Sequence, residues 1–149
     1  MFFKKNKSQQ MVEETKKTIE AANNLSDEDR HKSAKFIIEK LVKLILEGEG
    51  LKITATMDKQ TAKEYDDDYK KMINEHLFFA TSMRQNSISS MQEKDPKWIQ
   101  ACLLESYVIA KSDIINEKEE IEISDLISSW TENNLTKEEW KKAMSDMEY

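Results

Sequence analysis

The residues best suited to catalysis are few, because the chain contains two histidines and a single cysteine. His76 and Cys102 could in principle supply a general base and a nucleophile, which covalent catalysis needs within hydrogen-bonding reach of each other. Both residues fall on the apolar faces of expected helices, where a thiol stays protonated and unreactive. We therefore predict that both are structural and that the protein is not an enzyme.

The acidic motifs that look like metal ligands lack the geometry to hold an ion. Three successive aspartates at 66–68 would point about 100° apart around a helix, so they cannot converge on one ion. Glu28 and His31 match the Glu-x-x-His element of di-iron bundles, but Ile73 stands where a second such motif needs a glutamate before His76. The two glycines cannot build a phosphate-binding loop. The sequence therefore predicts no metal and no cofactor.

The distribution of charge indicates what chemistry a partner would have. The chain has 29 acidic and 23 basic side chains, a net charge of −6, and nine acids stand against two bases between positions 113 and 139. Such a surface is a poor match for the phosphates of nucleic acids and suits a basic protein. Glu119, Glu120 and Glu122 are therefore the acidic candidates for partner binding. Solubility is the simpler explanation of the same charge.

The first seven residues are expected to form a flexible basic arm, since Lys4, Lys5 and Lys7 are followed by no apolar stretch. A few lysines attract anionic lipid only weakly, so no stable membrane association is predicted. The chain has no run of about 18 apolar residues and no secretory signal, which makes the cytoplasm the expected location. A nucleic-acid binder that uses the N-terminal lysines is an alternative that the overall acidity disfavours.

The elements that must position these side chains are helices. Two glycines and one proline are too few for the turns of a β-sandwich or a doubly wound sheet. Apolar residues recur every three to four positions, so we predict an all-α, single-domain bundle of five to six helices spanning residues 1–149. The expected helices cover residues 8–23, 26–47, 58–84 and 95–115, followed by two shorter helices that begin at 124 and 136.

Three of these helices have clear start signals. Ser26 precedes a run of acids, Asp95 precedes Pro96 at the first helical position, and Thr136 with Glu139 forms a capping box. The helix that follows Pro96 is apolar on almost all sides. We therefore expect it to lie at the centre of the bundle.

The segment after the second helix has a different period. Gly48 and Gly50 are expected to end that helix, and residues 51–57 then alternate between apolar and polar, which is typical of a strand. Residues 120–123 alternate as well, so the two segments could pair as a small two-stranded ribbon. The alternative is an extended linker at 51–57, with Ile123 leading into the fifth helix.

Two phenylalanines break otherwise regular amphipathic patterns. Phe36 lies on the polar side of the second helix, and Phe78 lies on the polar side of the third. Large apolar groups on polar faces mark contacts. Coverage within the same chain is the favoured explanation, by the first helix in the case of Phe36. A seam between copies of the chain or a groove for a partner protein is the alternative.

Together these features favour a small interaction protein that binds a protein partner through helical faces. Its function would be that of an adaptor, a chaperone-like binder or a toxin-neutralising inhibitor. The alternative is a bundle with an internal small-ligand pocket, or an uncommon enzyme, around His76. Tyr65, Tyr69, Met72 and Met83 share the expected helical face with that histidine.

Overall fold

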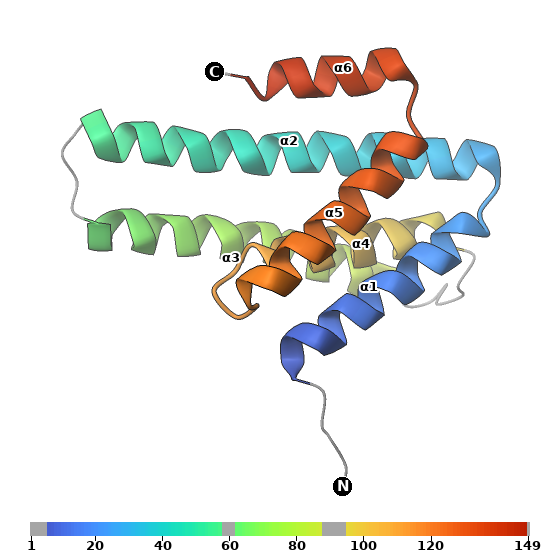
Figure 1. The fold of residues 1–149 in the computed structure, drawn as a ribbon, viewed down its shortest axis with the longest axis horizontal. Coiled ribbons are helices and arrows are strands. Elements are labelled where there is room, and N and C mark those ends of the chain that lie inside the picture. The colour runs from blue at the N-terminus through green and yellow to red at the C-terminus, as the bar shows by residue number, and fades with distance from the viewer. Residues whose placement is uncertain (1–5, 58–61, 88–94, 149) are drawn as a thin grey trace, which may run out of the picture.

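Six helices make up the part of the chain that the computed structural model describes, which is residues 6–57, 62–87 and 95–148. These ranges contain no strand, so the predicted all-α bundle is confirmed. Figure 1 shows the helices in chain order: α1 (Lys7–Asn23), α2 (Asp27–Met57), α3 (Ala62–Asn86), α4 (Pro96–Ala110), α5 (Glu117–Asn133) and α6 (Lys137–Asp146).

The centre of the bundle is α4, as its sequence predicts. It packs against α1, α2, α3 and α5. A helix that is apolar on all sides must be surrounded in this way to keep its side chains out of water. Its largest fully buried side chains are those of Ile99, Leu103, Leu104 and Val108.

The three predicted helix caps are confirmed. The hydroxyl of Ser26 accepts a hydrogen bond from a backbone N–H in the first turn of α2 (3.1 Å), and the carboxylate of Asp95 does the same for α4 (2.9 Å). Thr136 and Glu139 form the reciprocal capping box of α6. Each cap satisfies backbone donors that have no partner within the helix.

The expected end of the second helix is wrong, because α2 continues through both glycines to Met57 and reaches 31 residues. At about 1.5 Å per residue it is about 46 Å long. The two-stranded ribbon is wrong as well, since residues 51–57 belong to α2 and residues 120–123 belong to α5. A helix pairs its backbone groups within one segment, whereas a strand at 51–57 would need a partner that the fold does not supply.

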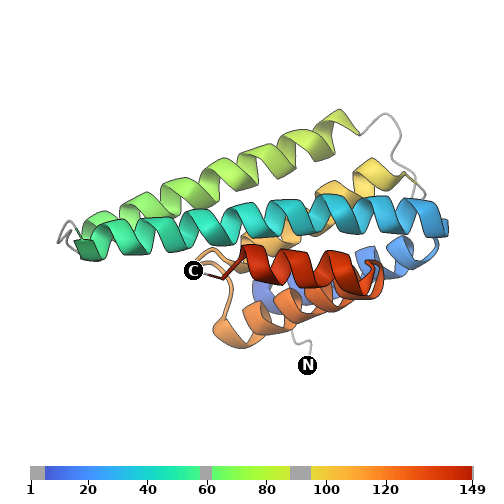
Figure 2. The ribbon, with the colours of Figure 1, turned by 90° about the horizontal axis from the view of Figure 1, so that it is seen from above.

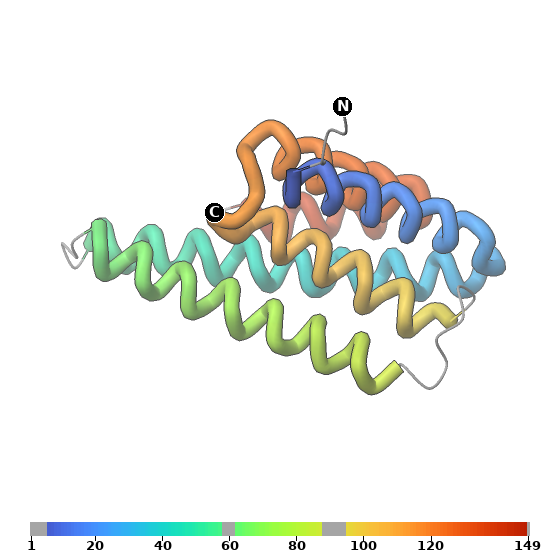
Figure 3. Tube along the Cα trace, turned by 90° about the horizontal axis from the view of Figure 1, so that it is seen from below, coloured from blue at the N-terminus to red at the C-terminus, as the bar shows by residue number. Residues whose placement is uncertain are grey.

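The distal parts of α2 and α3 form an arm. No described residue of α2 after Leu44 is buried. Beyond that point α2 and α3 pack against each other and extend past the ends of α4 and α5 (Figures 1 and 3). We call α2 and α3 together the α2–α3 hairpin.

Three further boundaries differ from those expected, and the first is the end of α4, which lies at Ala110 rather than at 115. The fifth helix starts at Glu117 rather than Ser124, with three acids in its first turn, where the helix dipole favours negative charge. At the N-terminus, Asn6 caps α1 through a capping box and Lys7 is already helical, so this part of the predicted flexible arm is wrong. The rest of that prediction falls on residues 1–5, which lie outside the described residues.

The last helix lies along α2 on the side away from α3 (Figures 1 and 2). Its first turn is beside the start of α2, and Asp146 near its end is beside Val42, so the two helices run in the same direction. One residue of α6, Ala143, is buried. The contact between α6 and α2 is therefore thinner than the contacts around α4.

Candidate interaction surfaces

Phe78 is the most exposed aromatic side chain on α3. Its exposed fraction is 75%, and it lies opposite the buried line of α3 formed by Met72, Ile73 and Ala80. It stands at the edge of a shallow depression whose other walls are the polar side chains of Asp67, Lys70, Lys71, Asn74 and Glu75. The favoured prediction of burial within the chain is therefore wrong for Phe78.

Phe36 has an explanation within the chain, but α1 does not provide it. The side chain is partly buried against the core. Lys40 Nζ lies 5.4 Å from the ring centroid of Phe36, on the same helix, and 4.8 Å from that of Phe79. The second of these cation–π contacts joins α2 to α3. Meanwhile α1 packs against α4 and α5. Coverage within the chain is thus correct for Phe36, and the predicted covering helix is wrong.

Phe79 is also a surface residue, although helical spacing places it at the edge of the apolar face of α3. Its exposed fraction is 45%, because it lies at the edge of that face, beside Lys40. Phe36 and Phe79 therefore share a contact with Lys40, and Phe78 precedes Phe79 on α3. We call these three residues of the α2–α3 hairpin the aromatic patch. The signal that could have found Phe79 is its place next to Phe78, at the border between the apolar and polar sides of α3.

His76 is held by a carboxylate from the neighbouring helix. Its Nε2 lies 2.8 Å from Glu47 Oε2, and its side chain is 11% exposed. The helical face around it is used in packing: Met72 is buried, and the rings of Tyr65 and Tyr69 stack with their centroids 6.2 Å apart. The contact therefore joins α3 to α2.

Cys102 is a poor nucleophile in this environment. Burial, followed by the nearby carboxylate of Glu105, raises the pKa of the thiol to about 11. The thiol is therefore protonated at neutral pH, whereas the thiolate is the reactive form. Among the described residues, moreover, no group of three or more His, Cys, Asp or Glu side chains is placed to hold a metal ion.

The predicted acidic residues lie on α5 and are partly engaged within the chain. Glu120 Oε1 lies 3.5 Å from Lys111 Nζ, and Glu122 Oε1 lies 3.4 Å from Lys16 Nζ on α1. Glu119 is half-buried. Exposed ion pairs of this kind are worth at most about 1 kcal/mol, so a partner's cation could exchange with the lysine.

A groove between α1 and α5 was not predicted from the sequence. It has a volume of about 620 Å³ and combines apolar side chains with acids and amides. Its lining includes Ile19 from α1 and, from α5, Ile121, Glu122, Asp125, Leu126 and Trp130. Ile121 is 54% exposed. In α5, Ile123 points into the core and Ile121 points to the solvent, so the helical position of Ile121 is the signal for this groove. The prediction missed it because it started the helix at Ser124.

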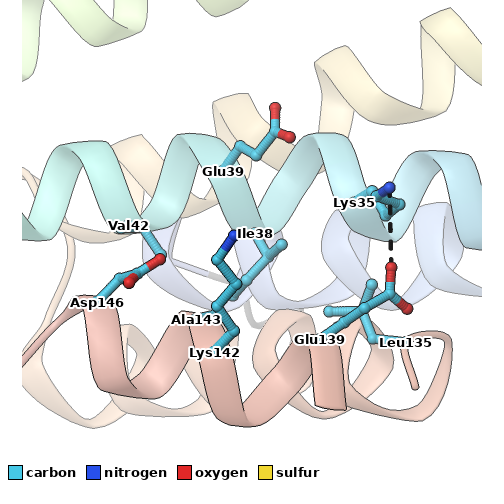
Figure 4. Close-up of a pocket in the computed structure, with 9 residues that line it drawn as sticks. All are labelled: Lys35, Ile38, Glu39, Val42, Leu135, Glu139, Lys142, Ala143 and Asp146. Carbon is cyan, nitrogen blue, oxygen red and sulfur yellow. Dashed lines mark ion pairs between the residues drawn. The ribbon is translucent and has the colours of Figure 1, made fainter. Parts of the chain in front are cut away.

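A second groove, of about 400 Å³, separates α6 from α2 (Figure 4). Glu139 lies at one end, 2.9 Å from His31 Nε2 and 3.9 Å from Lys35 Nζ. Its pKa is lowered to about 2, first by the backbone N–H of Thr136 and then by His31. This contact joins residues 108 positions apart, which no local pattern could have predicted. Because charges of both signs occupy its rim, the groove favours no single ligand.

No helix among the described residues is both long enough and apolar enough to span a membrane. Known protein families, curated protein sequences and solved structures offer no match to this chain.

Proposed function

We propose that this protein binds another protein through the aromatic patch on the α2–α3 hairpin and acts as an adaptor, a chaperone-like binder or an inhibitor. The observation that carries the proposal is the exposure of Phe78 and Phe79 at the surface of α3. These two phenylalanines follow one another in α3, and large exposed apolar side chains mark sites of contact.

The energetics of the patch support a protein partner. Full burial of a phenylalanine side chain contributes roughly 1.5–3 kcal/mol. Phe78 is bordered by polar residues such as Asp67, Lys71 and Glu75. An aromatic anchor bordered by polar residues that exclude water is the usual arrangement of an interface hot spot. The binding energy would therefore be concentrated in one or two side chains.

Binding fits the rest of the molecule better than catalysis or nucleic-acid recognition. His76, the candidate for an acid–base role, contacts Glu47 across the α2–α3 hairpin. Cys102, the candidate nucleophile, has a protonated thiol at neutral pH. The net charge of −6 disfavours phosphate backbones, and a gel-shift experiment at low salt would test this directly. The cytoplasm is the location we propose for this activity.

A photocrosslinking experiment tests the patch. A benzophenone amino acid is placed at position 78 and, as the matched control, at Gln85, which is exposed on the same helix. We expect crosslinks to a protein from position 78 and few from position 85. The crosslinked protein is then purified, and its affinity is measured for the wild type, for Phe78→Ser and for Gln85→Ser.

The proposal requires Phe78→Ser to weaken binding by about tenfold or more while Gln85→Ser leaves it unchanged. If the crosslinked protein is a second copy of the chain, its mass in solution will show a dimer that Phe78→Ser dissociates. Equal crosslinking from both positions would count against the patch. So would purification at low salt that recovers no partner.

A further inference from the structure

We propose that the groove between α1 and α5 binds a basic amphipathic helix supplied by a partner protein. The inference deepens the proposed function by naming the chemistry of a partner. It rests on that function only in taking the partner to be a protein, because the groove is a different surface from the aromatic patch.

The dimensions of the groove fit a helix. Its lining runs along α5 from Lys118 to Asn134, and Ile19 and Asn23 of α1 form the other wall. Sixteen residue steps at about 1.5 Å correspond to about 24 Å, which matches a helix of four to five turns. An amphipathic helix that inserts its apolar side into a groove is a common mode of peptide recognition.

The floor of the groove is fixed before any partner arrives. Trp130 is buried, and its Nε1–H donates a hydrogen bond to Asn23 Oδ1 at 2.9 Å. The side-chain amide of Asn134 donates to the backbone carbonyl of Trp130 at 2.8 Å. These bonds hold the ring and the end of α5 in place, so a ligand would pay little entropy to order them.

The apolar anchors are accessible above this floor. Ile121 is the most exposed of them, and Ile19 and Leu126 are partly exposed beside it. They lie on two helices on either side of the groove, so one apolar face of an incoming helix could contact all three. This pattern requires an amphipathic ligand rather than a uniformly polar one.

The charge of α5 selects a basic ligand. Between Glu117 and Asn133 the helix carries six acids and one base. Two acids, Glu122 and Asp125, and one base, Lys118, line the groove itself, and Glu122 forms an exposed ion pair with Lys16. Lysine or arginine side chains of a partner would meet complementary charge here, while acidic ones would be repelled.

The test uses two labelled synthetic peptides of about 16 residues, the length that spans the groove. One carries leucines on one helical face and lysines and arginines elsewhere, and the other replaces every basic residue with glutamate. Fluorescence anisotropy measures the affinity of each peptide at low and high salt. The protein is used as the full chain, in wild-type form and as Ile121→Ser, Asp125→Lys, Ile114→Ser and Phe78→Ser.

We expect the basic peptide to bind and the acidic peptide not to bind. Ile121→Ser should weaken binding by about tenfold, since it removes an exposed isoleucine that the ligand would bury. Asp125→Lys should weaken binding similarly and reduce its dependence on salt. Ile114→Ser, at an equally exposed isoleucine outside the groove, and Phe78→Ser should both bind as the wild type does.

Three results would overturn the inference: no binding of the basic peptide, equal binding of both peptides, or equal affinities for all variants. The last result would mean that the general acidity of the surface holds the peptide. Ile121 is exposed, so its replacement should not unfold the chain, and circular dichroism checks this. If no peptide binds in the groove but a partner still binds in a way that depends on Phe78, the inference about the groove fails and the proposed function stands.

Discussion

The replacement of Gly48 by alanine decides whether α2 continues through its glycines. In the structure Gly48 lies in the middle of a helix. A Cβ atom at this position would lie 3.7 Å from Met72 Cε and 3.7 Å from Tyr69 Cε2. Both distances are ordinary van der Waals contacts, so the added methyl group fits without displacing α3.

The expected effect is a gain in stability. Glycine in a helix interior costs about 0.8–1 kcal/mol relative to alanine, because it loses more backbone entropy on folding. The two new contacts add only about 0.1–0.2 kcal/mol each. Gly48→Ala should therefore raise the free energy of unfolding by about 1 kcal/mol. For a chain of this size, that raises Tm by about 2–4 °C.

Urea denaturation followed by far-UV circular dichroism measures this change, with Gly50→Ala as a companion variant in the same helix. The sign of the effect is the decisive result. If the glycines ended the helix with a left-handed residue, alanine would be strained there and would lower the stability instead. A lower denaturation midpoint for Gly48→Ala with an unchanged slope would therefore refute a continuous α2.

Three further predictions follow from the helices and their contacts. Ile123→Ala should lower the free energy of unfolding by about 2–5 kcal/mol because the side chain is fully buried. Ile121→Ala on the solvent side should change it by less than about 0.5 kcal/mol, and similar losses from both would contradict the orientation of α5. Because the pKa of Cys102 is raised from 9.0 to about 11, its thiolate fraction at mildly alkaline pH is about a hundredfold smaller than that of an unperturbed thiol. A more basic thiolate is more nucleophilic, by up to about tenfold over this range, so reaction with a disulfide reagent should be about tenfold slower, and urea should restore the rate. Glu139 has a pKa lowered from 4.5 to about 2, so its contribution to stability is present above the unfolded value and is lost as the pH falls through this window. Glu139→Gln should flatten the pH dependence of the urea midpoint there, and an unchanged curve would count against the capping box with Thr136 and the contact with His31.

The capping signals and the apolar periodicity were sufficient to predict the helical class. Ser26, Asp95 and Thr136 accept the hydrogen bonds expected of them because capping depends on residues within one turn of each other. The central place of α4 was also predictable, since its apolar residues point in all directions and must be covered. Such features depend on local spacing, which the sequence states directly.

The segment at 51–57 shows where local spacing misleads. Its alternating pattern is typical of a strand, yet it is helical, and Ile53 and Met57 are exposed as a result. The neighbouring helix decides this outcome: Leu51 packs against the core, and α3 lies alongside to cover one side of the extended α2. Tertiary packing thus outweighs the strand preference of a short segment that has no strand to pair with.

The candidate surfaces also combine features that local spacing predicts with features that depend on tertiary packing. Phe78 could be placed on the solvent side of its helix by counting residues, and the acids at 119–122 could be counted as charge. Whether another helix covers Phe78, and which helices pack near Phe36, depend on how the helices are arranged around α4.

By itself the sequence determined which segments are helical over most of the chain and where three of the helices begin. Those properties follow from interactions within a few residues. Only the tertiary structure decided that α1 lies beside α5 with a groove between them, that His31 meets Glu139, and that Phe78 is left uncovered. Each of these depends on the packing of helices far apart in the chain, because side-chain burial and complementarity between whole faces set their arrangement.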